Sequence, residues 1–140
     1  MLLTRDYVEP DFNLGKNVRC LMLTREFLEE KKSGPSNFLC KVTGKPVQLM
    51  EQVHGVKIKT VSNYLDEPLE GTDGIYTKSR DFALGVKTAD CIPLALSAED
   101  GSQIALLHVG WKGLCSGIIE KFLTKYSVER KKYNARPCLD

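Results

Sequence analysis

The sequence predicts a single domain that combines β-strands with at least one amphipathic helix. Its 140 residues are a normal length for one domain, and 42% of them are hydrophobic, a share typical of a chain that buries a core. Two apolar runs, 92–98 and 103–109, flank Asp100-Gly101, a strong short-range signal for a β-hairpin. Apolar residues then recur at helical spacing over 114–126. These observations predict a hairpin followed by a helix.

The rest of the chain is predicted to consist of shorter strands joined by irregular segments. Alternating or clustered apolar residues predict strands over 17–23, 56–61 and 83–88. The other stretches are predicted to be a short helix or loop over 26–32, a breaker over 33–36, an acidic loop over 66–74 and a loose tail over 130–140.

Composition argues against a membrane protein and a nucleic-acid-binding protein. No apolar run approaches the ~20 residues of a transmembrane helix. The first residues also lack the pattern of a secretory signal, so we expect a cytoplasmic protein. A net charge of +2 is too small to indicate nucleic acid. The segment 112–136 contains seven basic residues and two acidic ones. We interpret this segment as a solvated helix face and tail, and the alternative is an anion site near the start of the segment.

Five cysteines and two histidines supply the groups most suited to chemistry. The cysteine number is odd and no two cysteines form a Cys-x-x-Cys pair, so a disulfide framework is not expected. With Asp100-Gly101 at the centre of the hairpin, Cys91 pairs with Gly110, and Pro93 pairs with His108. Cys91 and His108 would then project from one face of the hairpin, with their Cα atoms roughly 7–8 Å apart.

That separation would allow Cys91 and His108 to bind one zinc ion, with His54 from another segment as a third ligand. Three protein ligands leave the fourth position open, as in catalytic zinc sites. Two alternatives remain at this point. The three residues are unrelated, or Cys91 and His108 act without metal as a nucleophile and its base.

Four motifs occur in a fixed order in the chain. They are Gln52-Val53-His54-Gly55, Thr72-Asp73-Gly74, Thr88-Ala89-Asp90-Cys91-Ile92-Pro93 and His108-Val109-Gly110-Trp111-Lys112-Gly113. In this order they resemble the signature of the YfiH-type laccase-domain family, whose members are described as polyphenol oxidases or purine nucleoside phosphorylases. The resemblance implies an α+β fold over residues 1–140, with mixed β-sheets in layers and helices outside. It also implies a zinc ion held by His54, Cys91 and His108.

The resemblance further implies a purine nucleoside and phosphate as substrates. Family members split adenosine, inosine or methylthioadenosine with phosphate, and adenosine deamination is a second implied activity, which zinc suits because it lowers the pKa of bound water. Phosphorolysis needs an anion site, for which we expect Lys112 beside a helix N-terminus. Arg25 and Asp73 are further candidates for substrate contact. The alternatives are a surface role for Lys112 and Arg25 and a turn-capping role for Asp73. We expect Trp111 to be a packing residue.

The chain differs from the family in length, since members continue after the helix into a strand with a Gly-Pro-x-Ile motif. We therefore expect a short or truncated member that lacks the C-terminal part of the domain, with self-association as one way to cover exposed strand edges. Three functions stay open: a zinc-dependent purine nucleoside enzyme, a degenerate zinc-binding domain without catalysis, and a Cys91–His108 thiol hydrolase. Copper-based phenol oxidation is disfavoured because two histidines cannot supply the imidazoles of a multicopper site.

Overall fold

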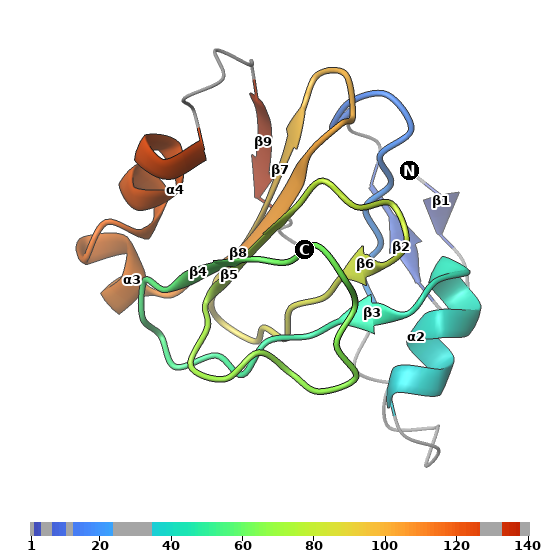
Figure 1. Cartoon of the computed structure of the whole chain (residues 1–140), viewed down its shortest axis with the longest axis horizontal. Helices are drawn as coiled ribbons and strands as arrows, with labels where there is room; N and C mark the ends of the chain where they lie inside the picture. Colours follow the sequence, from blue (N-terminus) through green and yellow to red (C-terminus); the bar gives the residue numbers. More distant parts are fainter. Residues whose placement is uncertain (1, 4–6, 11–12, 24–34, 127–132, 138–140) are drawn as a thin grey trace.

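A mixed five-stranded sheet forms the centre of the computed structural model, which describes residues 2–3, 7–10, 13–23, 35–126 and 133–137. The strand order is β4-β5-β8-β7-β9, where β4 pairs with β5 in parallel and the other pairs are antiparallel (Figure 1). The strands are β4 (Ile58–Thr60), β5 (Gly74–Thr77), β7 (Ile92–Ala98), β8 (Ile104–Val109) and β9 (Tyr133–Pro137). The short β4 confirms a strand within 56–61.

The predicted hairpin and its register are confirmed. Strands β7 and β8 pair with Pro93 opposite His108 and Ile92 opposite Val109, the register expected from the sequence. The turn itself differs from the expected two-residue type. Among its residues only Gly101 has a positive φ, at 68°, and its amide N–H donates to the Ala98 carbonyl at 2.8 Å. The connection is therefore a four-residue loop, which keeps the same register.

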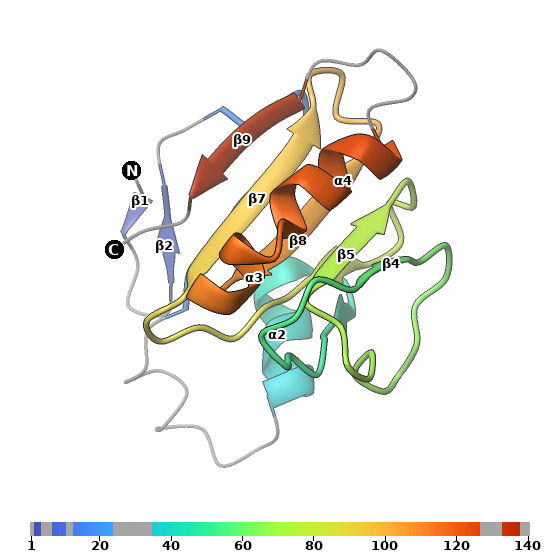
Figure 2. The same cartoon turned by 90° about the vertical axis from the view of Figure 1, so that its left-hand side faces the viewer.

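Two helices cover one face of the sheet, where the sequence predicted one continuous helix. Helix α3 (Trp111–Cys115) begins directly after β8, and α4 (Ile118–Tyr126) follows after a break at Gly117, whose φ is +80°. Figure 2 shows both helices lying across β7 and β8. Their contact with the sheet forms a buried apolar core of Tyr76, Leu96, Ala105, Leu107, Val109, Ile118 and Phe122.

The opposite face of the sheet packs against loops and the N-terminal segment. A second core surrounds the fully buried Ile75 and contains Met50, Val61, Leu69 and Phe82. A parallel pair of short strands, β3 (Val47–Gln48) and β6 (Ala83–Leu84), lies in this layer, and helix α2 (Pro35–Thr43) precedes β3. The sheet thus lies between two layers, which confirms the expected α+β fold with mixed sheets.

Several local expectations are wrong. The predicted strand over 17–23 retains only an isolated bridge between Met22 and Val8 of β2 (Val8–Glu9), which pairs with β1 (Leu2–Leu3). The strand expected over 83–88 is limited to β6. The supposed loose tail contains β9, which pairs with β7 because β7 would otherwise be an open edge. Helix α2 begins within the predicted breaker, at a proline, a residue favoured in the first turn of a helix. Residues 26–32 lie outside the described residues.

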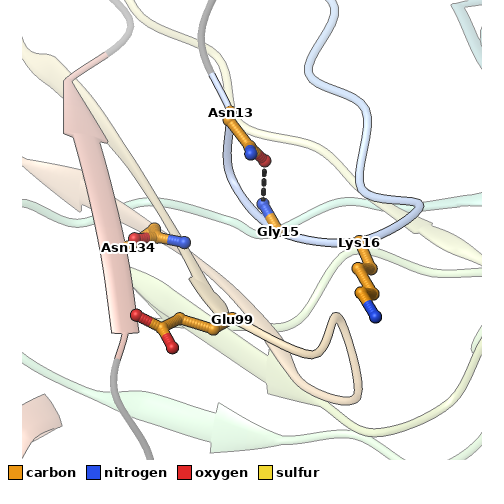
Figure 3. Close-up of a pocket in the computed structure, with 5 residues that line it drawn as sticks. All are labelled: Asn13, Gly15, Lys16, Glu99 and Asn134. Atoms are coloured by element: carbon orange, nitrogen blue, oxygen red, sulfur yellow. Dashed lines mark hydrogen bonds between the residues drawn. The ribbon is translucent and has the colours of Figure 1, made fainter.

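The N-terminal segment is joined by hydrogen bonds to the hairpin loop and to β9. The Lys16 amide N–H donates to the Glu99 carbonyl at 3.2 Å, and the Asn134 side chain of β9 donates to the Leu14 carbonyl at 3.4 Å. An open pocket of about 470 Å³ lies beside these contacts and is lined by Asn13, Gly15, Lys16, Glu99 and Asn134 (Figure 3). Gly15 has a φ of 139°, and a Cβ placed there would lie 2.6 Å from the Ala98 carbonyl oxygen.

Among the described residues, no helix is long and apolar enough to cross a membrane.

Candidate metal centre

His54, Cys91 and His108 converge from three separate segments of the chain. One ligand atom from each lies within 4.8 Å of those of the other two. Cys91 directly precedes β7 and His108 lies in β8, so the hairpin register places both side chains on the sheet face opposite α3 and α4. His54 comes from the loop before β4. The three residues that the sequence predicted as ligands are therefore brought together.

The imidazole of His108 is held in one orientation by a buried carboxylate. His108 is only 3% exposed, and its Nδ1 lies 2.8 Å from Oδ1 of the fully buried Asp73. A carboxylate accepts hydrogen bonds, so this contact places the hydrogen on Nδ1 and leaves the Nε2 lone pair available as a ligand. Histidine ligands of metal ions are commonly oriented by a carboxylate in this way.

The same Asp73 carboxylate holds the backbone of the His54 loop. It accepts hydrogen bonds from the amide N–H groups of His54 at 2.9 Å, Gly55 at 2.8 Å and Val53 at 3.3 Å. Burial alone raises the pKa of Asp73, but the His108 hydrogen bond and the three amide bonds together lower that pKa below its usual value. Asp73 is therefore an ionised group that joins two of the three ligand residues.

His54 has a backbone conformation that residues with side chains rarely adopt. Its φ is +60°, in the left-handed region. This conformation turns three successive N–H groups towards the Asp73 carboxylate, which offsets the local strain. The His54 and His108 rings meet edge to face, with centroids 4.9 Å apart. His54 therefore lies beside His108 with its backbone in a strained conformation.

Two glycines allow the helix segment to approach the ligands. A Cβ on Gly110 would lie 3.0 Å from Cδ2 of His54 and 3.2 Å from Sγ of Cys91. A Cβ on Gly113 would lie 2.8 Å from the backbone oxygen of Gly55. The absence of side chains at both positions lets the start of α3 pack against the ligand loop. The glycines at 110 and 113 are a sequence signal from which this close packing could have been predicted.

The three ligand residues open into a cleft of about 580 Å³. A reciprocal pair of hydrogen bonds joins two of its walls: Gln52 Nε2 donates to the Lys87 carbonyl at 2.6 Å, and the Lys87 N–H donates to Gln52 Oε1 at 3.0 Å. Sequence reasoning included Gln52 in a motif but assigned no role to Gln52 or to Lys87. The cleft is lined by Met50, Glu51, Gln52, His54, Lys87, Thr88, Ala89, Asp90, Cys91 and His108.

The other predicted site residues lie elsewhere. Asp73 is fully buried behind His108, and its observed contacts are with the protein. Lys112 is exposed in α3, with Nζ 5.6 Å from the centroid of the Trp111 ring, and it is absent from the described residues that line the cleft. Trp111 is 73% exposed, so the expectation that it is a packing residue is wrong. Arg25 lies outside the described residues.

Solved structures share this fold. A crystal structure of a Neisseria meningitidis protein from the family DUF152 has a TM-score of 0.74 and 21% identity, covering 89% of this chain and 58% of that chain. The structure of YlmD from Geobacillus stearothermophilus has a TM-score of 0.62 and 23% identity, covering 74% of this chain and 45% of that chain. At these identities the likeness shows the fold alone.

Curated relatives match part of their own length. A purine nucleoside phosphorylase of Rickettsia conorii is 33% identical over 107 residues, which are 76% of this chain and 42% of that protein. The purine nucleoside phosphorylase YfiH of Escherichia coli K12 is 36% identical over 85 residues, 59% of this chain and 33% of that protein. The chain therefore spans less than half the length of these relatives.

A sequence family supplies the broadest match. The family described as multi-copper polyphenol oxidoreductase laccase matches residues 35–137, a range that contains His54, Cys91 and His108. Both the ligand cluster and all five strands of the central sheet lie within the matched range. The chain therefore belongs to the multi-copper polyphenol oxidoreductase laccase family.

Proposed function

We propose that this chain carries the zinc centre of a purine nucleoside phosphorylase. The observation that carries the proposal is the convergence of His54, Cys91 and His108 at a cleft. Two imidazoles and one thiolate leave one tetrahedral position open for a substrate or water, as in catalytic zinc sites. Because this chain covers 42% of the Rickettsia relative, the activity named for that relative is part of the proposal.

The residues present suit zinc better than the copper in the family's description. Nitrogen and thiolate ligands are typical of zinc. The Asp73 carboxylate, hydrogen-bonded to His108, fixes the imidazole tautomer that a metal requires. Multicopper sites use more imidazoles than the two histidines of this chain supply. When bound, zinc would supply a Lewis acid to the cleft.

The cleft is also large enough for a small-molecule substrate. Its volume of about 580 Å³ lies in the range of ordinary small-molecule sites. Lys87 is the lysine among the described residues that line it, so we assign the phosphate to Lys87 rather than to Lys112. Adenosine, inosine and methylthioadenosine are the proposed nucleosides, and adenosine deamination is a proposed second activity.

Metal content and nucleoside turnover test the proposal together. We expect about one zinc ion per purified chain, and release of hypoxanthine from inosine that depends on phosphate. His54→Ala should lose both, whereas Cys40→Ala, which removes an exposed cysteine on α2, should retain both. Zinc binding without turnover would favour the non-catalytic zinc domain. Turnover that persists in His54→Ala would contradict the proposal.

The phosphate assignment has its own expected result. Lys87→Ala should raise the KM for phosphate about tenfold while changing kcat little, because a cation that binds phosphate before and during reaction contributes to uniform binding. Lys112→Ala is the matched control and should leave this KM within about twofold. Steady-state rates measured at varied phosphate would reverse the assignment if Lys112→Ala had the larger effect.

One observation favours a second candidate, a thiol hydrolase. Cys91, His108 and Asp73 form a series in which the thiol lies near the imidazole and the imidazole contacts a buried carboxylate. In this candidate Cys91 would be the nucleophile and His108 its base. Hydrolysis that survives chelation but is lost after alkylation of Cys91 would support it, and loss of activity upon chelation would exclude it.

A further inference from the structure

We infer that Gln52 is a positioning residue that sets the spacing between His54 and Cys91 by joining the two segments that carry them. This inference rests on the proposed zinc function. Gln52 lies two residues before His54, and Lys87, its partner, lies four residues before Cys91. Neither segment is a strand or helix at these positions, so regular backbone pairing does not fix their separation.

The Gln52 side chain makes hydrogen bonds just beyond the end of the backbone pairing between two strands. Strands β3 and β6 pair in parallel, and their hydrogen bonding extends to the Gly85 N–H and the Gln48 carbonyl, 2.9 Å apart. The Gln52 amide accepts from the Lys87 N–H at 3.0 Å and donates to the Lys87 carbonyl at 2.6 Å. One side chain thereby supplies both the donor and the acceptor that a neighbouring strand would supply.

The three ligands differ in how they are tied together. Asp73 links the His54 backbone to the His108 ring through hydrogen bonds at 2.9 Å and 2.8 Å. Cys91 is placed differently, because it lies one residue before the first β7–β8 pair, Ile92 with Val109. The Gln52–Lys87 contact connects the segment before Cys91 to the His54 loop. Together with Asp73, this contact connects the segments that carry all three ligands, although none of Asp73, Gln52 and Lys87 is itself a ligand.

Gln52 and Lys87 also differ in exposure in a way that fits this role. Gln52 is half-buried and the Lys87 side chain is exposed at the cleft, and the two hydrogen bonds that join them are exposed to solvent. Removing the Gln52 amide takes the protein partner from both backbone groups of Lys87, and water replaces it, so the cost in global stability is small. The expected consequence is a looser Cys91 segment in an otherwise folded chain.

Zinc affinity measured by competition with a chromophoric chelator tests the inference. Gln52→Ala should bind zinc about 10- to 100-fold more weakly, the usual effect of removing a group that supports metal ligands. The metal-free thermal midpoint should move by no more than a few degrees. Glu70→Ala, at an exposed acidic position outside the cleft, is the matched control and should keep the wild-type affinity.

Gln52→Glu provides a second variant with nearly the same shape. It keeps an acceptor for the Lys87 N–H but places a carboxylate against the Lys87 carbonyl, so it should also weaken zinc binding. It should also speed alkylation of Cys91 in the presence of limiting zinc. Wild-type affinity in both variants would overturn the inference and leave the zinc proposal intact. Absence of zinc binding by the wild-type chain would instead overturn the zinc proposal.

Discussion

Asp73 has a role that its position in the sequence only partly indicated. An acidic residue before a glycine in a polar loop predicted either a substrate contact or a turn cap. The observed side chain caps the 53–55 loop and also contacts the His108 ring, from a fully buried position. The partners lie 18 to 35 residues away in the chain, so no local pattern could reveal the second contact. The same limit applies to His54, because its φ of +60° depends on those same amide bonds.

Replacing Asp73 by Asn should destabilise the metal-free protein. The amide keeps one acceptor oxygen but loses the charge that receives four hydrogen bonds in a buried place. We expect a loss of about 3 kcal/mol in the free energy of unfolding, measured by urea denaturation with circular dichroism. Asp66→Asn is the matched control, since Asp66 is exposed and accepts one bond from Tyr64, and it should lose less than about 0.5 kcal/mol.

The cost of that substitution should depend on pH in a defined direction. The pKa of Asp73 is lowered in the folded state, so its contribution to stability is complete above the unfolded pKa of about 3.9. As pH falls through the lower folded value, the carboxylate is protonated in both states and the contribution is lost. The difference in unfolding free energy between wild type and Asp73→Asn should therefore shrink below about pH 4. A constant difference between about pH 6 and pH 3 would contradict this explanation.

Secondary-structure elements with local signals were predicted well, and those that depend on partners were not. The Asp100-Gly101 signal and two apolar runs predicted the hairpin register, and that register correctly placed Cys91 beside His108. The predicted turn type was wrong. The register was still correct, because the observed loop has the same centre as the predicted turn and therefore gives the same residue pairs. Strand β9 carries no strong pattern, since its formation depends on the free edge of β7. The single predicted helix is divided because Gly117 adopts a φ of +80°.

The junction between β8 and α3 gives a prediction for an element boundary. Gly110 has an ordinary φ of −79°, so alanine there introduces no backbone strain. Its Cβ would nevertheless lie 3.0 Å from His54 and 3.2 Å from the Cys91 sulfur, closer than normal contact. Gly110→Ala should therefore displace two ligands and weaken zinc binding by about tenfold or more, while the chain remains folded. Equilibrium dialysis against zinc measures this effect.

A second glycine separates steric from backbone effects. Gly71 has a φ of +58°, and a methyl group placed on its Cα would meet nothing within 4 Å, so Gly71→Ala acts through the backbone alone. It should cost about 1 kcal/mol of unfolding free energy and leave zinc affinity unchanged. If Gly110→Ala bound zinc as tightly as Gly71→Ala, the close approach of α3 to the ligands would have no functional consequence.

The complete site is assembled from segments that lie far apart in the sequence. The loop at 51–55, Asp73, the stretch at 87–91 and the end of β8 meet on one face of the sheet. Residue spacing alone could connect Cys91 with His108, since both belong to one hairpin. His54 was predicted as a ligand from the number of histidines and the family resemblance, because its distance from the hairpin depends on the tertiary fold. Gln52 and Lys87 could not be found from spacing at all.

Because the ligands come from separate segments, zinc should stabilise the fold as well as supply chemistry. A ligand that binds only the folded state adds about 4 kcal/mol when its free concentration is roughly a thousandfold above its Kd. We expect zinc to raise the thermal midpoint of wild type and of Cys40→Ala, and EDTA to reverse the rise. Cys91→Ala removes one of the three ligands, so its midpoint should respond weakly to zinc. An equal zinc response in Cys91→Ala and Cys40→Ala would mean that zinc binds elsewhere, because both variants lose one thiol and only one loses the proposed ligand.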